Sequence, residues 1–341
     1  MTDGPDRDGL GTDGLGRDGR GAAYDVVVVG GGAAGLSGAL TLARARRSVL
    51  VVDAGAPRNA PAAGVHGLLG HDGVPPGVLL ERGRAEVRGY GGEAVTGEVV
   101  GATREDGGFA VALAGGQVVR ARRLLVATGL VDELPDVPGL RERWGRDVVH
   151  CPYCHGWEVR DRAIGVLATG PMAVHQALLF RQWSADVVLL AQGVELAAEQ
   201  REQLAARGVD VVPGDVAGVE VVDDRLAGVR LADGRVVARE VVAVASRMVA
   251  RTGLLAGLGL GTVEHPMGVG EHVPVDPTGR TAVPGVFAAG NVSDLVAQVG
   301  AAAAQGAWVA AQVNFDLVTE DTLRAVEAAR ARTTDGVAAP A

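Results

Sequence analysis

The 341-residue chain contains no lysine, so arginine supplies all 32 of its basic residues. Without a lysine amine, Schiff-base catalysis and a Walker-type phosphate loop are both excluded. The net charge is −9, and such a chain offers no basic surface for nucleic acid or an anionic membrane. It also lacks an apolar run of membrane-spanning length and the apolar region of a signal peptide. We therefore predict a soluble, cytoplasmic protein with no nucleic-acid or membrane partner.

Cysteine is almost absent, and the only two form the motif Cys151-Pro152-Tyr153-Cys154, followed by His155-Gly156-Trp157. Two thiols at this spacing can close into a disulfide and reopen. A zinc site would need two further ligands; there is no second such motif, and His66 and His71 lie in a distant loop where we expect both to face solvent. We predict no metal site and a redox-active pair, because cytoplasmic cysteine pairs are more often catalytic than structural.

The first ordered stretch predicts a dinucleotide site. Residues 1–23 repeat Asp, Gly and Arg, which indicates a disordered tail. A buried strand at residues 24–29 then leads into glycines at Gly30, Gly32 and Gly35 and into a helix. A second strand at residues 48–52 ends in Asp53. This order places a pyrophosphate on the helix N-terminus and an acid near the adenosine ribose.

Two later strands end in small residues that allow close approach to a bound ring system. The first ends in Ala127-Thr128-Gly129, and the second leads into Gly290 and Asn291, before a long alanine-rich helix predicted over residues 292–315. Between the first βαβ unit and these strands we predict a long loop at residues 54–76, which is long enough to line a site. An antiparallel meander is predicted within residues 93–113.

The middle of the chain predicts a second βαβ unit whose nucleotide chemistry has decayed. Its glycine turn begins with Ala168, and Pro171 removes a backbone N–H where phosphate would lie. The following strand ends in Leu190-Ala191-Gln192-Gly193, which offers no acid for a ribose and no arginine for a phosphate. We expect a Rossmann-like scaffold without a working nicotinamide site.

These motifs together resemble the low-molecular-weight thioredoxin reductase family from Tyr24 to about Asn314. The resemblance implies an α/β fold with two Rossmann-like, three-layer ββα dinucleotide-binding domains. The boundaries we predict are a tail at 1–23, the first part of an FAD-binding domain at 24–137, an inserted central NAD(P)-binding-like domain carrying the cysteines at 138–250, the second part of the FAD domain at 251–318, and a C-terminal helix and tail at 319–341.

The resemblance also implies FAD as cofactor, a homodimer, and distinct roles for the two cysteines. Cys154 would face the flavin, and Cys151 would exchange with substrate. The cofactor-binding residues would be Gly30, Gly32, Ala33, Ala34, Gly35, Asp53, Ala54, Arg58, Asn59, Ala127, Thr128, Gly129, Gly290, Asn291, Gln298 and Val299.

Four departures from the family pattern narrow the resemblance. Asn291 replaces the usual acid, the second glycine turn is eroded, an arginine-rich NADPH-recognition run is missing, and His155 replaces an acid after the second cysteine. Together they resemble the branch of FAD-dependent dithiol oxidases that close disulfides in sulfur-containing natural products.

We therefore hypothesise that Cys151 and Cys154 oxidise a small-molecule dithiol, with dioxygen as electron acceptor. His155 titrates near neutrality and would act as the base. An NADPH-dependent or ferredoxin-dependent disulfide reductase is the alternative enzyme, and a flavin-binding redox sensor is the non-enzymatic alternative.

Overall fold

The computed structural model describes residues 23–337, and its backbone contacts divide the chain into two units. The first unit consists of three segments: the chain up to Pro57, Leu80–Leu130, and the chain from Ala250 onward. The second comprises Arg58–Leu79 and Val131–Val249. The predicted tail lies outside the described residues, except for Ala23, which begins the first strand. Within residues 23–337, no helix is both long and apolar enough to cross a membrane.

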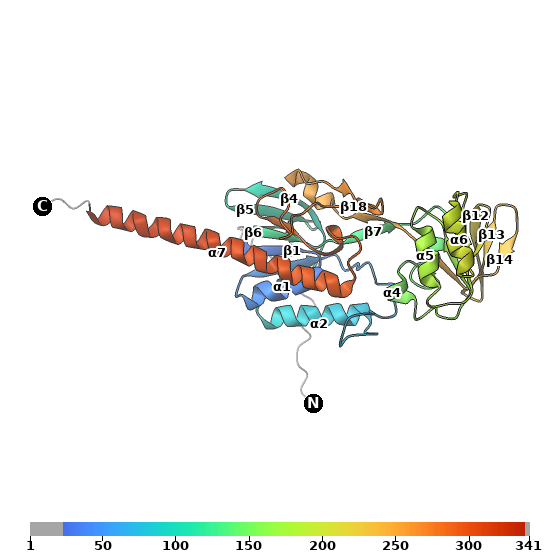
Figure 1. Cartoon of the computed structure of the whole chain (residues 1–341). Coiled ribbons are helices and arrows are strands. Elements are labelled where there is room, and N and C mark those ends of the chain that lie inside the picture. The colour runs from blue at the N-terminus through green and yellow to red at the C-terminus, as the bar shows by residue number, and fades with distance from the viewer. Residues whose placement is uncertain (1–22, 338–341) are drawn as a thin grey trace, which may run out of the picture. The chain divides into compact units, whose positions relative to one another are not determined.

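The first unit is built on a seven-stranded sheet (Figure 1). Its strands are β1 (Ala23–Val29), β2 (Val49–Asp53), β3 (Glu93–Thr96), β4 (Val99–Glu105), β5 (Gly108–Leu113), β6 (Val118–Val126) and β19 (Val286–Ala288). The path runs β3-β2-β1-β6-β5-β4, with β19 also paired to β6. In register, Val27 lies opposite Leu50 on one side and Leu124 on the other. The run of four valines is almost wholly buried, as expected for a parallel strand covered on both faces.

Helices cover one face of this sheet. They are α1 (Ala33–Arg44), α2 (Pro76–Gly89) and α7 (Val299–Val337), and Figure 1 shows them together below the strands. Leu42, Val87 and Val313 are fully buried in the core between helices and sheet. The opposite core contains Leu255 of the 3-10 helix η2 (Gly253–Leu258) and Val111 of β5. The result is the predicted three-layer arrangement.

Three details of this unit differ from the sequence-based predictions. Strand β3 pairs in parallel with β2 and is not part of the antiparallel meander, which contains β4, β5 and β6. Helix α7 begins at Val299, because residues Gly290–Val292 form a 3-10 helix (η3) and a loop follows. The same helix continues without a break past the boundary predicted at residue 318.

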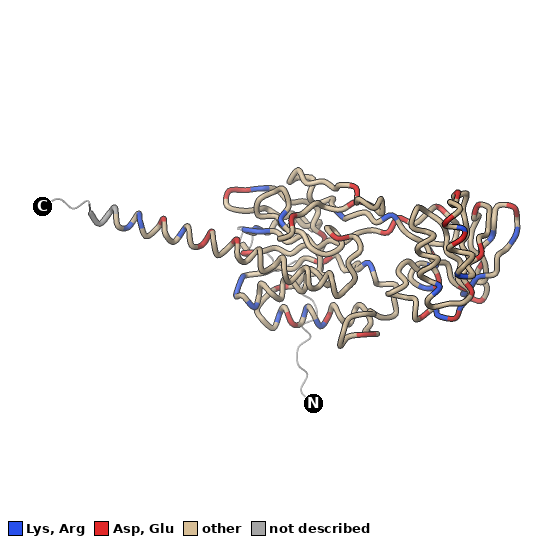
Figure 2. The backbone as a smooth tube through the Cα atoms, in the orientation of Figure 1, with Lys and Arg blue, Asp and Glu red and all other residues tan. Residues whose placement is uncertain are grey.

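Ion pairs join α7 to the rest of the first unit. Asp321 accepts hydrogen bonds from Arg47, at 2.7 Å, and from Arg122 of β6. Arg123 pairs with Glu320 at 2.6 Å. Figure 2 shows that acidic and basic residues continue along the helix beyond these contacts. The antiparallel strands β17 (Val263–Glu264) and β18 (Gly270–His272) also belong to this unit.

The second unit contains a five-stranded parallel sheet with the order β11-β10-β9-β15-β8. These strands are β8 (Val148–Val149), β9 (Ile164–Leu167), β10 (Val187–Leu190), β11 (Asp210–Val212) and β15 (Val241–Val244), with helices α3 (Leu140–Arg143), α4 (Pro152–His155), α5 (Ala173–Phe180) and α6 (Ala198–Ala206). A three-stranded antiparallel sheet contains β12 (Val216–Val222), β13 (Arg225–Leu231) and β14 (Val236–Val237). Besides the crossings after Pro57 and Leu79, the chain passes between the units at β7 (Leu130–Glu133) and β16 (Arg247–Ala250).

Candidate active site

The first glycine turn has the geometry that a dinucleotide requires. Gly30 adopts φ +104°, and a Cβ placed on it would lie 2.3 Å from the carbonyl oxygen of Ala127. A Cβ on Gly35 would lie 1.9 Å from the carbonyl oxygen of Gly30. Both positions therefore exclude any larger side chain, and they bring α1 close to β1 and β6.

Gly32 differs from its two neighbours in the motif, because a Cβ there would have no atom within 4 Å. It is the N-cap of α1, and no side chain caps the helix N-terminus. The first N–H groups of the helix are thus available to an anionic group in open space. Ala33 and Ala34 are the first helical residues, and their small side chains leave that approach free.

Asp53 ends β2 beside this turn. A Cβ on Gly31 would lie 2.8 Å from its carboxylate, and Arg84 of α2 lies 3.8 Å from the same group. Ala54 follows it at an exposed position. The carboxylate is half-buried and lies next to the helix N-terminus, which is the arrangement predicted for holding a ribose.

Residues from the later strands complete the first unit's candidate site. In the segment Ala127-Thr128-Gly129, the Thr128 hydroxyl donates a 2.7 Å hydrogen bond to the Arg251 carbonyl, and Gly129 has φ +70°. Gly290 has φ +77°, and its N–H donates to Gln305 Oε1 at 2.6 Å.

Asn291 has a role that the sequence did not reveal. Its amide donates to the carbonyl oxygens of Asp294 and Ala297, both at 2.9 Å. It therefore ties down the loop that leads to Gln298 and to Val299, the first residue of α7. A carboxylate has no N–H to donate, so the acid usual in the related family could not make these bonds.

The cysteine motif lies in the second unit, at the start of α4. Cys151 is the N-cap of this short helix and Pro152 is its first residue. Both thiols are half-buried, and the Cys154 thiol donates to Cys151 Sγ over 2.6 Å. Proline at the first helical position fixes a favourable φ without the loss of a helical hydrogen bond, so the local sequence presets the pair.

The two thiols are electrostatically unequal. The hydrogen bond from Cys154, aided by backbone N–H groups and the Arg58 charge, lowers the pKa of Cys151 to about 7. The hydrogen bond to Cys151 and burial raise the pKa of Cys154. Near neutral pH the reduced pair therefore contains a Cys151 thiolate stabilised by a Cys154 thiol, and Cys151 is the better nucleophile and leaving group.

His155 is suited to accept a proton. Burial lowers the pKa of His155, and the nearby His66 lowers it further. Glu158 partly offsets this shift. The imidazole is thus neutral near pH 7. His150, on the other side of the motif, has its Nδ1 3.2 Å from the Val244 carbonyl and its own carbonyl bound by Gln176, contacts that hold the chain in place.

The segment Arg58–Leu79, which contains most of the predicted loop and the start of α2, belongs to the second unit. Arg58, which we predict to contact the cofactor together with Asn59, donates two 2.7 Å hydrogen bonds to Asp132, and its positive charge favours the thiolate form of both cysteines. His66, which we predicted to face solvent, is only partly exposed, and its ring nitrogens lie 3.4 Å from Glu158 and 3.5 Å from Asp72. His71 is exposed as predicted. The length of the loop was the one sequence signal for these contacts.

Two side chains at the second glycine turn and the strand after it are hydrogen-bonded within the protein. The Thr169 hydroxyl donates to the Ala245 carbonyl at 3.0 Å. Gln192, which stands where a ribose-binding acid would, accepts a 2.7 Å hydrogen bond from the Val216 N–H. Pro171 leaves the turn with one N–H fewer. Elsewhere among residues 23–337, no group of three His, Cys, Asp or Glu side chains is arranged to hold a metal.

A dinucleotide-type glycine turn in one unit and a Cys-x-x-Cys pair in the other define a flavin-dependent disulfide oxidoreductase. The chain belongs to the pyridine nucleotide-disulphide oxidoreductase family, whose sequence profile matches residues 24–306. It is an oxidoreductase with a thioredoxin reductase-like fold, and its cofactor is FAD, for which the turn at Gly30–Gly35 provides the open approach described above.

Named relatives support this assignment. The chain is 33% identical to thioredoxin reductase tcpT of Claviceps purpurea over 78% of its own length and 86% of that protein. A probable thioredoxin reductase of Arthroderma benhamiae is also 33% identical, over 52% of this chain and 45% of that relative's length. The solved structure of HlmI is 52% identical, with a TM-score of 0.84, and covers 92% of this chain and 98% of HlmI.

Proposed function

We propose that this oxidoreductase converts a small-molecule dithiol into a disulfide through Cys151 and Cys154, with dioxygen as the final electron acceptor. The overall change removes two electrons and two protons from the dithiol and reduces dioxygen to hydrogen peroxide. The observation that carries the proposal is the contrast between the two glycine turns. The first turn is followed by Asp53 at the end of β2, whereas the second turn contains Pro171, which has no N–H, and is followed after β10 by Gln192, whose side chain accepts a hydrogen bond from the Val216 N–H.

In the proposed reaction the chain's own residues perform the sulfur exchange. A substrate thiolate attacks Cys151 Sγ of the oxidised pair, which breaks the Cys151–Cys154 bond and frees Cys154 as a thiolate. The second substrate thiol then attacks the substrate sulfur of the mixed disulfide and expels Cys151, whose lowered pKa favours this departure. Neutral His155 accepts a proton from the attacking thiol. FAD, held at the turn of Gly30, Gly32 and Gly35, would supply the two-electron redox chemistry that links the reduced cysteine pair to dioxygen.

Anaerobic absorbance of the FAD-loaded protein tests this function. We expect a dithiol to bleach the flavin band, NADPH and NADH to leave it unchanged, and air to restore it with one peroxide formed per dithiol. Bleaching by NADPH within the turnover time would contradict the proposal and identify a disulfide reductase. Bleaching by none of the three would also contradict it, and would indicate a protein electron donor such as ferredoxin or a redox sensor.

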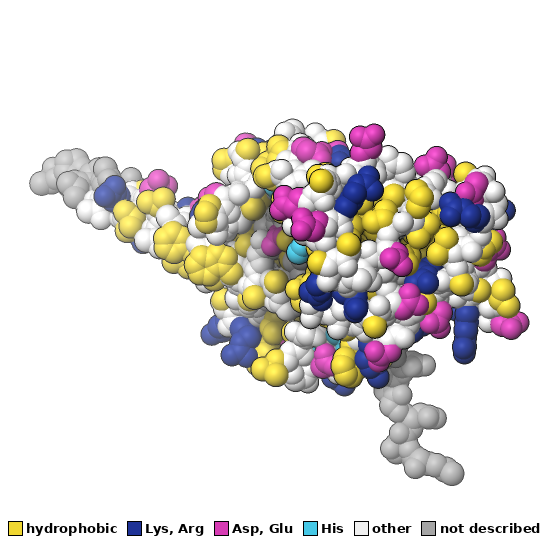
Figure 3. Space-filling view, turned by 45° about the vertical axis from the view of Figure 1, so that its right-hand side comes forward, with side chains coloured by type: hydrophobic (Ala, Val, Ile, Leu, Met, Phe, Trp, Pro, Cys, Tyr) yellow, Lys and Arg dark blue, Asp and Glu magenta, His cyan; other side chains and the backbone are white. Residues whose placement is uncertain are grey.

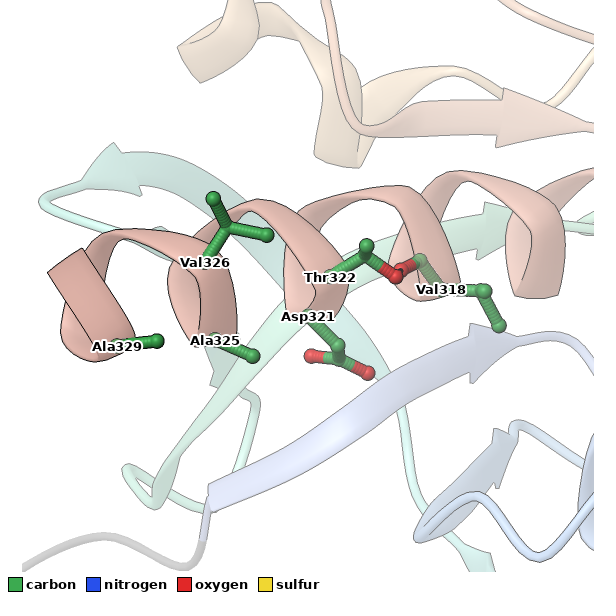
Figure 4. A pocket seen from close by; sticks show the side chains of 6 residues that line it. All are labelled: Val318, Asp321, Thr322, Ala325, Val326 and Ala329. Atoms are coloured by element: carbon green, nitrogen blue, oxygen red, sulfur yellow. Dashed lines mark hydrogen bonds between the residues drawn. The ribbon is translucent and has the colours of Figure 1, made fainter.

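We further propose that the protein is a homodimer, with α7 as the contact. Apolar and small exposed residues follow a three-four spacing along one face of this helix, at Phe315, Val318, Thr322, Ala325 and Ala329, the pattern of a two-helix seam. Figure 3 shows hydrophobic side chains gathered there. A shallow groove of about 460 Å³ follows the same face, and Figure 4 labels its lining residues: Val318, Asp321, Thr322, Ala325, Val326 and Ala329.

A second copy of the chain is the occupant that this seam favours. The positions that flank it are uncharged, except for Asp321, whose charge is already paired with Arg47 and Arg122. Two copies can therefore approach without like-charge repulsion, and alanines allow the helices to lie close.

Sedimentation velocity of matched variants tests the seam. We expect the wild type to be a dimer and Ala325→Glu to be a monomer at micromolar concentration, because the added carboxylates would be buried against each other. Ala331→Glu, on the opposite face of the same helix, should remain dimeric. A monomeric wild type, or a dimeric Ala325→Glu variant, would show that α7 does not join two copies.

A further inference from the structure

Aromatic side chains are scarce in this protein, yet they concentrate around the cysteine pair. The whole chain has four tryptophans, three tyrosines and four phenylalanines. Tyr153 lies between the two cysteines, and Trp157 follows three residues after Cys154. Their exposed fractions are 63% and 65%. Large exposed rings beside a reactive group indicate a binding surface, because a soluble protein gains nothing from leaving them in water.

Tyr153 is held from one side. Its ring meets Trp183 edge to face, with centroids 5.9 Å apart and an interplanar angle of 88°. Trp183 in turn contacts the buried Phe180, at 6.4 Å. A Cβ on Gly156 would lie 2.7 Å from the Trp183 ring, so a glycine is needed for this indole to pack against the end of α4. The inner edge of Tyr153 is thus fixed while most of its ring is exposed.

Trp157 is also held from one side. The guanidinium carbon of Arg160 lies 4.1 Å from the centre of its ring, and Arg160 donates a 2.6 Å hydrogen bond to the Trp157 carbonyl. An arginine stacked on an aromatic ring restricts its rotation. Tyr153 lies in α4 and Trp157 lies two residues beyond its end, so both exposed rings are within three residues of Cys154 along the chain.

We propose that Tyr153 and Trp157 form a platform that binds the flat, apolar body of the dithiol substrate while its thiols reach Cys151. This inference rests on the proposed function and narrows its substrate class to dithiols carried on a planar, uncharged ring system. Stacking recognises such a body without hydrogen bonds, and it disfavours short, flexible, polar dithiols. Arg160 stacks on the indole and makes a cationic substrate body unfavourable there.

Steady-state kinetics of the FAD-loaded protein with two dithiols tests the platform. The probes are ortho-xylylene dithiol, whose thiols are carried on a benzene ring, and dithiothreitol, which has no ring. In the Tyr153→Ala/Trp157→Ala variant we expect KM for the aromatic dithiol to rise about tenfold, and KM for dithiothreitol to change by less than about twofold. Tyr90→Ala is the matched control, because Tyr90 is 52% exposed and also carries a stacked arginine, Arg44, at 4.7 Å. It should leave both values unchanged.

A binding measurement separates this inference from the proposed function. The dimethylated thioether of ortho-xylylene dithiol cannot be oxidised, and calorimetry should detect its binding to the wild type and to Tyr90→Ala but not to the double variant. That result would support the platform even if the protein oxidised no dithiol. An equal loss with both dithiols would overturn the inference, as would unchanged binding in the double variant. The inference would also be overturned if the double variant lost only the oxidation of a reduced thioredoxin-like protein and kept that of both small dithiols. That result would indicate a protein substrate.

Discussion

Replacement of Cys151 by serine is expected to reduce dithiol turnover by roughly a thousandfold or more, because the group that exchanges with substrate is lost. The glycine turn that we propose to hold FAD lies in the other unit, so the variant should retain the cofactor. Steady-state peroxide formation and the flavin absorbance of the purified variant measure the two properties. Turnover near the wild-type rate would remove the exchange role from Cys151.

The unequal thiols add a dependence on pH. Because the pKa of Cys151 is lowered to about 7, its thiolate is present above pH 7 and is lost as the pH falls through that value. Alkylation of the reduced protein by iodoacetamide should follow this curve and modify Cys151 first, as peptide mass spectrometry would show. Cys154→Ala removes the hydrogen-bond donor that is the largest cause of the shift, so the curve should move to higher pH. Cys154→Ser keeps a donor and should move it less.

His155 can be separated from the cysteines in the same assays. His155→Ala should leave the alkylation of Cys151 intact and slow dithiol turnover most near and below neutral pH, where a substrate thiol depends on a base. An unchanged rate and pH profile would show that His155 does not transfer protons.

Replacement of Gly35 by alanine is the second change with a large expected effect. The new Cβ would lie 1.9 Å from the Gly30 carbonyl oxygen, and backbone cannot yield as a flexible side chain can. We expect a loss of free energy of unfolding on the order of 3 kcal/mol, together with loss of FAD. Urea denaturation and the flavin-to-protein absorbance ratio measure both.

Gly32→Ala provides the contrast. No atom lies within 4 Å of its added Cβ, and the residue has φ −77°, so the free energy of unfolding of the FAD-free protein should change by less than about 1 kcal/mol. FAD affinity should still fall, because the methyl group would enter the open space at the helix N-terminus. If both variants bound FAD normally, this turn would not be the cofactor site.

The sequence predicted the elements whose signals are local. The valine run of β1, the glycines after it and Asp53 at the end of β2 lie where their order along the chain indicated. The parallel pairing of β3 was missed because a four-residue strand carries too little pattern to distinguish a parallel neighbour from a hairpin. The late start of α7 was missed because alanine-rich sequence favours a helix from residue 292, whereas the amide of Asn291 holds the intervening loop in another conformation.

Of the candidate active site, only the cysteine motif could be predicted from the sequence. Cys151, Cys154 and His155 are adjacent in sequence, so their proximity required no tertiary information. The contacts of Arg58 with Asp132 and of His66 with Glu158 join residues far apart in the chain. The contact between the rings of Tyr153 and Trp183 also joins residues far apart in the chain. No sequence spacing predicts any of these contacts.

The pairing of β19 with β6 has a consequence for how the protein is made. Leu124 lies beside Val286 in this sheet, and all the strands of the parallel sheet in the second unit lie between them in the chain. A ribosome therefore completes the second unit while β6 still has an open edge, and open edges promote aggregation. We expect nascent chains released before residue 286 to aggregate. We also expect folding of the first unit to be the slow, chaperone-dependent step of biogenesis, because its contacts close the longest loops.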